Sequence, residues 1–200
     1  MKKYFLIFFI FTISLVSSKS EVITNNQEIT TLIENSWNSI STMSGRFEQI
    51  DVDNKIEHGS FYFSKPHKSK FSYDHKDETI ITNRILINIL DDEGYQIDSY
   101  PIGNSPIKNI LSSNFKFDDT FTVTSVKQLF DKEDMYQITA INKNSENSDG
   151  KVLFFFSVVD LTLRKWVIFD EFGNKTVLEF TNMQKNIFIE PNIFVVRYRH

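Results

Sequence analysis

The sequence predicts an α+β domain: two helices against one face of a single curved, incompletely closed antiparallel sheet of about 10–12 strands. Three observations support this prediction. A long helical apolar period occurs only in residues 24–43, apolar residues recur at every second position from residue 44 onward, and short polar turns separate the resulting segments. Segments so closely spaced favour an antiparallel meander over crossover connections.

The N-terminal helix is predicted over residues 24–43. Thr24, followed three residues later by Gln27, is typical of a capping box. The apolar residues of this stretch recur at steps of three and four and form one stripe: Ile29, Leu32, Ile33, Trp37 and Ile40. A helix with such a stripe must lie against an apolar surface.

The strands are predicted from the alternating segments. Their expected ranges are 44–52, 56–64, 69–74, 78–82, 85–90, 95–100, 120–127, 135–142, 151–159, 162–170, 174–183 and 193–199. Residues 152–156 are apolar on both faces, which predicts a strand in the middle of the sheet. The polar stretch 143–150 predicts an exposed loop.

A second, short helix is predicted between two strands. Ser105 suits the N-cap position, Pro106 suits the first helical position, and Ile107, Ile110 and Leu111 follow with helical spacing. Together with the N-terminal helix, this insertion could cover one concave face of the sheet.

Residues 1–20 are predicted to be a secretory signal peptide. Two lysines precede a short apolar run, which is followed by the small residues Ser18 and Ser20 at the −3 and −1 positions of a cleavage site. The alternative is an uncleaved membrane anchor, but the run is shorter than the ~20 residues that span a bilayer. We therefore expect one exported domain over residues 21–200, which is long enough for a sizeable core.

The composition argues against nucleic-acid binding. The chain has no cysteine and contains 26 Asp and Glu; because three of its 22 Lys and Arg lie in residues 1–20, the exported chain would carry a net charge of about −7. An acidic chain without a basic stripe binds nucleic acid poorly. We expect no nucleic-acid partner.

No catalytic or metal-binding pattern is present in the sequence. It lacks a nucleophile elbow, a phosphate-binding glycine loop and a His-Glu-x-x-His motif. The four histidines, His67 among them, are not spaced to share a metal, and the acidic clusters lie in turn contexts. We therefore expect no enzyme, metal site or cofactor, and interpret these side chains as solvated or structural.

The stretch 45–73 is the most informative part of the chain. Alternation in an extended strand puts Phe61, Phe63 and Lys65 on one face. A lysine at the end of a row of phenylalanines is unusual in an ordinary core, because an apolar wall does not solvate an ammonium group. The exported chain holds 16 of the 20 phenylalanines, and composition alone fits both a packed core and an apolar ligand site.

The same stretch resembles the periplasmic outer-membrane lipoprotein carrier family (LolA type). The resemblance rests on Phe-Glu-Gln at 47–49, Gly-x-Phe-x-Phe-x-Lys-Pro at 59–66 and Lys-Phe-x-Tyr at 70–73. Residues 106–111 are similar to the family's proline-containing lid helix, and residues 170–176 to its Asp-x-x-Gly turn. The order and spacing of these motifs agree over nearly the whole exported chain.

The resemblance implies a half-open barrel whose two helices form a lid over an apolar cavity. It implies a monomeric periplasmic carrier of the acyl chains of triacylated lipoproteins. Cargo would come from an inner-membrane ABC-type lipoprotein releasing complex and pass to an outer-membrane receptor, or directly to that membrane. The lid would open without ATP by exchanging lid–wall contacts for acyl–wall contacts.

The resemblance also implies roles for particular residues. The acyl-binding wall would consist of Phe47, Phe61, Phe63, Phe71 and Tyr73. The lid would consist of Trp37, Ile40, Ile107, Ile110 and Leu111. Lys65 stands where the family has an arginine that holds the lid closed; lysine keeps the charge but lacks the planar guanidinium, so we expect a less firmly closed state.

Two further positions depart from the family pattern. Ser69 replaces an apolar residue, and residues 194–200 lack the usual Pro-Gly tail. Two alternatives to lipoprotein carriage stay open: an envelope structural or interaction protein whose interior is simply filled, and a carrier of other lipids. Binding of a hydrophobic dye would distinguish a lipoprotein carrier from the first alternative. Identification of the lipids that co-purify with the protein would distinguish it from the second.

Overall fold

The computed structural model describes residues 26–103, 105–130, 134–144, 150–170 and 172–199. The predicted signal peptide and the predicted cap residue Thr24 lie outside these ranges. The strands are β1 (Thr42–Ile50), β2 (Ile56–Ser64), β3 (Lys68–Tyr73), β4 (Thr79–Thr82), β5 (Leu86–Leu90), β6 (Gln96–Pro101), β7 (Phe121–Leu129), β8 (Met135–Asn142), β9 (Lys151–Ser157), β10 (Leu163–Phe169) and β11 (Lys175–Lys185).

These strands form one 11-stranded sheet in the order β6-β5-β4-β3-β2-β1-β11-β10-β9-β8-β7. All paired strands are antiparallel, and β1 pairs with β11, which joins the N-terminal and C-terminal halves of the meander. β6 and β7 are the two edges and do not pair with each other, so the barrel stays open. The prediction of an α+β domain with a single unclosed antiparallel sheet is confirmed.

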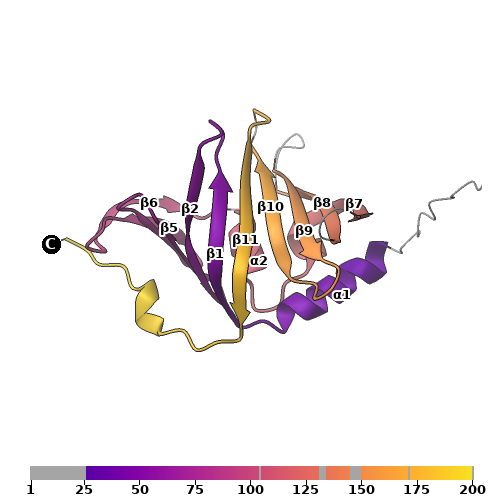
Figure 1. Ribbon diagram of the computed structural model, residues 1–200, viewed down its shortest axis with the longest axis horizontal. Coiled ribbons are helices and arrows are strands. Elements are labelled where there is room, and N and C mark those ends of the chain that lie inside the picture. The colour runs from indigo at the N-terminus through magenta and orange to yellow at the C-terminus, as the bar shows by residue number, and fades with distance from the viewer. Residues whose placement is uncertain (1–25, 104, 131–133, 145–149, 171, 200) are drawn as a thin grey trace, which may run out of the picture.

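Three helices accompany the sheet in the described ranges: α1 (Asn26–Asn38), α2 (Pro106–Ile110) and α3 (Phe117–Thr120). In Figure 1, α2 lies behind β10 and β11, and α1 runs beneath the ends of β9 and β10. Within the part of the chain that the structure describes, no helix is long and apolar enough to cross a membrane.

One local prediction about these elements is wrong, and the structure adds detail at two others. Residues 39–43 do not continue α1, because Thr42 and Met43 pair with β2 and this tertiary pairing overrides the helical period. Ser105 occupies the N-cap position of α2 but makes no side-chain cap hydrogen bond. Asp118 and Asp119 lie in the first turn of α3, which the sequence analysis missed.

The C-terminal segment is a strap rather than the predicted strand 193–199. It contains the 3₁₀ helix η1 (Pro191–Phe194), which lies near β3, and one bridge between Arg197 and Tyr95. In Figure 1 it leaves the end of β11 and runs to the β5–β6 end of the sheet. Among the described residues this single bridge is the only strand pairing of 193–199, so no full strand forms here.

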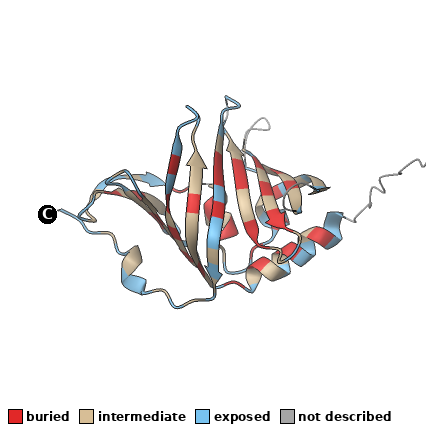
Figure 2. Ribbon diagram, in the orientation of Figure 1, coloured by how far each residue is buried: buried red, intermediate tan, exposed pale blue. Residues whose placement is uncertain are grey.

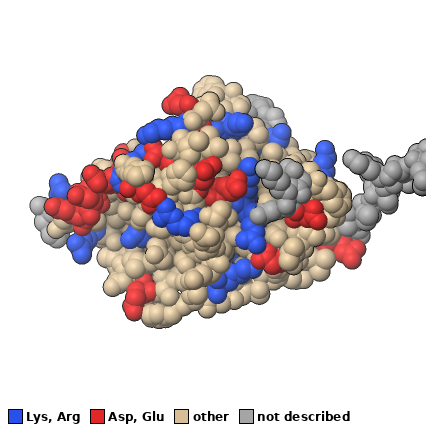
Figure 3. Space-filling view, in the orientation of Figure 1, with Lys and Arg blue, Asp and Glu red and all other residues tan. Residues whose placement is uncertain are grey.

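The main core lies between the inner face of the sheet and the helices. Alternate residues of the central strands are buried, as the red bands of Figure 2 show, and one contiguous cluster joins them to α1 and α2. Rings dominate this cluster, and each fully buried phenylalanine contributes about 1.5–3 kcal/mol through apolar burial. The surface seen in Figure 3 carries charges of both signs, interspersed with one another.

Candidate functional site

Four of the five predicted wall residues form one aromatic surface on the inner face of β1, β2 and β3. Phe61 lies 4.7 Å from Phe63, Phe63 lies 5.7 Å from Phe71, and Phe71 lies 5.3 Å from Phe47, all between ring centroids. All four are buried. Tyr73 is half-buried at the far end of the row, with its ring against that of Phe47.

Two glycines let these rings lie flat on the sheet. A Cβ at Gly59 would approach the Phe47 ring to 2.5 Å, and one at Gly45 would approach the Phe61 ring to 2.8 Å. Each glycine lies on a strand next to its ring, opposite it in register. The glycines of the 45–73 stretch are therefore a requirement of the aromatic wall.

The predicted lid residues lie in the same packed cluster as the wall. The five side chains from α1, α2 and the residues just after them are all buried: Trp37, Ile40, Ile107, Ile110 and Leu111. The structure thus brings the predicted wall and lid residues into one layer-to-layer contact. Their roles in ligand binding stay a prediction.

Lys65 joins the sheet to both helices through one tryptophan. Its Nζ donates a hydrogen bond of 2.6 Å to the carbonyl oxygen of Trp37 and lies 4.8 Å from the centre of the Trp37 ring. The indole Nε1–H of Trp37 donates in turn to the carbonyl oxygen of Ile110, at 2.7 Å. Because Trp37 lies in the last turn of α1, its carbonyl is at the negative end of the helix dipole. We call Lys65, Trp37 and Ile110 the latch.

His67 adds a second attachment that the sequence analysis missed. Its backbone N–H donates to the carbonyl of Leu111 at 2.7 Å, and its Nδ1, which must carry the proton, donates to the carbonyl of Lys108 at 3.0 Å. His67 adopts a φ of 63°, a left-handed conformation that histidine tolerates better than most residues. Nothing in the sequence signals this contact, because it depends on how α2 docks.

Burial perturbs two titratable groups of the site. Desolvation lowers the pKa of Lys65 to about 8, so the ammonium is still mostly charged at neutral pH. Burial, reinforced by the charges of Glu57 and Glu78, raises the pKa of Tyr73 to about 12. The Tyr73 hydroxyl donates to Gln49 at 2.9 Å.

The crevice between Lys65, Phe63 and the lid residues is closed in this conformation and has no space for a water molecule. The predicted cavity would therefore form only if the helices moved, and it stays a prediction.

Several inner-face rings were not among the predicted site residues. They are Phe115, Phe117, Phe154, Phe156, Trp166 and Phe180. The period-two alternation of β9, β10 and β11 could have identified those on strands, whereas Phe115 and Phe117 lie around a short helix that has no periodic signal. The indole Nε1–H of Trp166 is buried and has no acceptor among the described residues.

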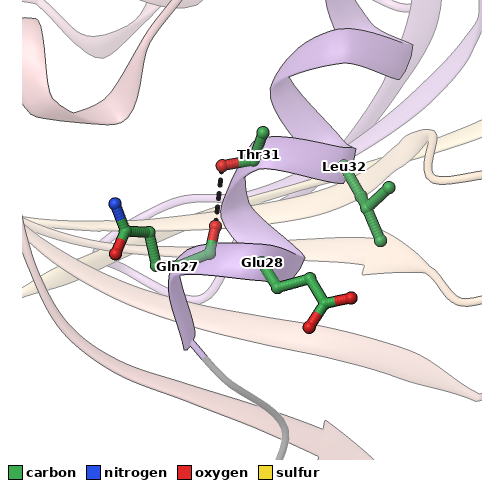
Figure 4. Close-up of a pocket in the computed structure, with 4 residues that line it drawn as sticks. All are labelled: Gln27, Glu28, Thr31 and Leu32. Carbon is green, nitrogen blue, oxygen red and sulfur yellow. Dashed lines mark hydrogen bonds between the residues drawn. The ribbon is translucent and has the colours of Figure 1, made fainter.

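Two hollows lie away from this interior. The larger, of about 950 Å³, is on the outer face and is lined by Phe155, Met135, Lys165 and Glu179 among others. The smaller, of about 400 Å³, is a shallow depression beside Gln27, Glu28, Thr31 and Leu32 of α1 (Figure 4). Neither hollow includes a predicted site residue.

Comparisons with known proteins agree with this architecture. A family model described as "Outer membrane lipoprotein carrier protein LolA" matches residues 38–197. No curated protein matches the chain. An uncharacterized conserved protein from Thermus thermophilus has a solved structure with a TM-score of 0.51 at 9% identity, covering 88% of this chain and 100% of that chain.

Two other solved structures are similar at lower scores. A LolA superfamily protein from Nitrosomonas europaea has a TM-score of 0.44 at 10% identity, covering 83% of this chain and 97% of that chain. The MucA/MucB complex of Pseudomonas aeruginosa gives a TM-score of 0.48 at 7% identity, covering 84% of this chain and 61% of that chain. The family model spans most of the sequence, and the chain belongs to the outer membrane lipoprotein carrier protein LolA family.

Proposed function

We propose that this protein carries acylated lipoproteins through the periplasm, with the acyl chains bound against the phenylalanine wall after α1 and α2 move aside. The predicted signal peptide in residues 1–20 would direct the protein to the periplasm. There it would act as a monomer. Cargo would arrive from an inner-membrane ABC-type releasing complex and leave to an outer-membrane receptor, or to that membrane directly.

The observation that carries the proposal is the latch. An ordinary core gains nothing from a half-buried ammonium, because its partial desolvation costs free energy. A lid that opens and closes benefits from such a contact, because a few hydrogen bonds can be exchanged while the apolar wall stays intact. Burying a 16-carbon chain would return on the order of 10 kcal/mol, enough to replace the lid–wall contacts.

Release from spheroplasts tests the proposal. Purified protein is mixed with spheroplasts whose lipoproteins carry a labelled fatty acid, and the soluble fraction is analysed. We expect labelled lipoprotein in a soluble complex with this protein, and none with heat-unfolded protein. If all the label stays with the spheroplasts while circular dichroism shows folded protein, lipoprotein carriage is excluded.

Delivery can be separated from uptake with two lysine variants. Lys65→Leu removes the polar contact that stabilises the closed state. Closing of the helices would then displace bound cargo less readily, so we expect normal uptake of lipoprotein but reduced transfer to outer membranes. Lys70→Leu, on the outer face of β3, should transfer normally. Equal transfer by both variants would mean that Lys65 plays no part in the cycle.

The closely packed core cluster favours one alternative, a structural or interaction protein of the envelope that takes no lipid. The uncharged dye N-phenylnaphthylamine distinguishes the two, because a protein that takes no lipid should not bind the dye in a way that a fatty acid displaces. Binding that a lipoprotein or fatty acid displaces supports the carrier.

A further inference from the structure

Most of the strongly exposed apolar side chains lie at one end of the sheet. The connections of the antiparallel meander alternate between two ends. One end holds the turns after β2, β4 and β9, the connection after β7 and the start of the strap after β11; Lys65 lies there, so we call it the latch end. Among the described residues, five large apolar side chains are at least 70% exposed, and four belong to the latch end: Ile85, Phe130, Val159 and Phe188. Single exposed apolar residues are ordinary, but this concentration at one end calls for an explanation.

The backbone beneath these side chains is anchored. The side-chain oxygen of Asn83 accepts a hydrogen bond from the N–H of Ile85 at 2.8 Å. Just before Phe188, the N–H of Asn186 donates to the carbonyl oxygen of Thr42 at 2.8 Å. Figure 1 shows the start of the strap at the lower side of the molecule and the β1–β2 and β10–β11 turns at the upper side. The apolar tips are therefore presented by separate, anchored segments of one end.

The opposite end is acidic. Four of its turns hold nine Asp or Glu residues and two lysines within the described part of the chain; these turns are 51–55, 74–78, 91–95 and 170–174. Arg46 and Arg199 pair with three of these acids, and the other six have no ion pair among the described residues. An anionic surface would repel this end of the molecule.

The latch end is not acidic. Its turns hold two cations and two carboxylates among their described residues, and one of the carboxylates, Asp160, pairs with Arg164 and Lys185. Arg84 in the β4–β5 turn and Lys68 at the start of β3 are exposed and belong to no ion pair among the described residues. An anionic surface would attract these two cations, so charge selects the latch end as the contacting end.

Separate apolar tips fit a lipid bilayer better than a protein surface. A protein interface is built around a closely packed apolar core that matches one partner in shape. A bilayer deforms around each side chain and accepts several apolar tips and nearby cations at its headgroup level.

We propose that the latch end docks on a bilayer that contains anionic phospholipid, with Ile85, Val159 and Phe188 inserted at headgroup level and Arg84 and Lys68 beside the phosphates. This inference goes beyond the proposed function, because docking needs neither cargo nor an opening of the interior. Docking would place the latch, and with it the ends of α1 and α2, next to the membrane.

Flotation with lipid vesicles tests the proposal. Purified protein without cargo is mixed with vesicles of phosphatidylethanolamine and phosphatidylglycerol, or of phosphatidylcholine alone, and the protein that floats with the vesicles is measured. We expect binding to the phosphatidylglycerol vesicles that weakens as salt is added, and weaker binding to phosphatidylcholine. A protein that does not float with the phosphatidylglycerol vesicles at low salt overturns the inference. Dye displacement by fatty acids tests the proposed function independently.

Phe188→Ser and Phe172→Ser are a matched pair of variants, because both rings are 81% exposed and they lie at opposite ends of the sheet. Phe188→Ser should weaken vesicle binding roughly tenfold, since its ring would leave water on docking, whereas Phe172→Ser should bind as the wild type. Arg84→Gln should weaken binding to the phosphatidylglycerol vesicles roughly fivefold and leave binding to phosphatidylcholine unchanged.

Two results of this comparison would overturn the inference. Equal losses in Phe188→Ser and Phe172→Ser would mean adsorption without a preferred end. Unchanged vesicle binding by Phe188→Ser would show that its ring does not meet lipid; if that variant also failed to release lipoprotein from spheroplasts, the latch end would contact a membrane protein instead. Circular dichroism checks that each variant is folded.

Discussion

At the scale of single residues, Lys65 is the position where sequence and structure agree most closely. The alternation that continues from β2 placed it on the face of Phe61 and Phe63, and in the structure its ammonium contacts the last turn of α1. The sequence could not reveal that its acceptor is the carbonyl of Trp37, because backbone acceptors leave no trace in residue types. Lys65 contacts Trp37 through one hydrogen bond and one cation–π interaction. An arginine at this position could donate two parallel hydrogen bonds from its planar guanidinium group.

The buried ammonium should make stability depend on alkaline pH. The pKa of Lys65 is about 8 in the folded protein and near 10.4 in an unfolded chain, so the unfolded state binds more protons between these values. The contribution of Lys65 to the free energy of unfolding therefore rises from pH 8 to about 10.5, by at most about 3 kcal/mol. Urea unfolding at about pH 7 and about pH 10 measures it.

Other groups titrate in the same range, so the comparison is with Lys65→Met. As the pH rises, the free energy of unfolding of the wild type should increase relative to that of Lys65→Met. Lys70→Met provides the control and should follow the wild type. A difference that stays constant with pH would show that Lys65 is solvated as an ordinary surface lysine.

At the scale of elements, β2 depends on Gly59. A methyl group there would lie 2.2 Å from the carbonyl oxygen of Ser72 on β3, so the backbone pairing would have to shift as well as the Phe47 ring. We expect Gly59→Ala to lower the free energy of unfolding by about 3 kcal/mol. Ser60→Ala, the next residue on the opposite face, should change it by no more than about 0.5 kcal/mol. Similar values for the two variants would contradict close packing on the inner face.

The β9–β10 turn is fastened to β11 by Asp160. Burial alone would raise the pKa of Asp160, but hydrogen bonds from Lys185 and Thr162 and the charge of Arg164 together lower it to about 2. The carboxylate therefore stabilises the fold above about pH 4, and this contribution is lost as the pH falls through about 2.

Asp160→Asn should therefore lower the free energy of unfolding by about 1 kcal/mol at neutral pH, because the group is partly solvated. At about pH 2 the variant and the wild type should be nearly equally stable. Glu190→Gln, at an exposed carboxylate without an ion pair among the described residues, should have no effect at either pH. Thermal unfolding at the two pH values checks this, and a loss that persists in acid would assign it to packing rather than charge.

The elements themselves were predictable to different degrees. The eleven strands follow from local alternation, and α2 follows from Pro106 and the apolar residues after it. Residues 193–199 alternate like a strand, but whether they pair depends on distant partners, and among the described residues only Arg197 finds one. α3 is a single turn between Phe115 and β7 and has no periodic pattern to detect.

At the scale of the whole molecule, the order of the strands explains why the wall exists. β1 and β11 bring the first and last strands of the meander together, so that Phe47, Phe61 and Phe180 meet on one inner face. This assembly combines residues far apart in sequence; the family resemblance implied a half-open barrel, but the pairing that adds Phe180 to the wall depends on distant partners that no local pattern specifies. Composition could not distinguish a filled interior from a cavity, because the same rings serve both.

The interior and the outer hollow give two places where an acyl chain could bind. The interior requires movement of α1 and α2, and offers the rings and the donors of the latch. The outer hollow is already open, at about 950 Å³, but Lys165 and Glu179 pair across it and leave less apolar surface. We therefore propose that the acyl chain binds in the interior rather than in the outer hollow.

Quenching of Trp37 by a brominated fatty acid tests this placement most directly. In the variant Trp166→Phe, Trp37 is the only tryptophan of the sequence, and bromine atoms on a bound chain quench it only on close contact. We predict strong quenching by the brominated acid and none by the unbrominated one, with both displacing the dye. A brominated acid that displaces the dye but leaves Trp37 emission unchanged would place the ligand elsewhere and contradict the opening of the interior.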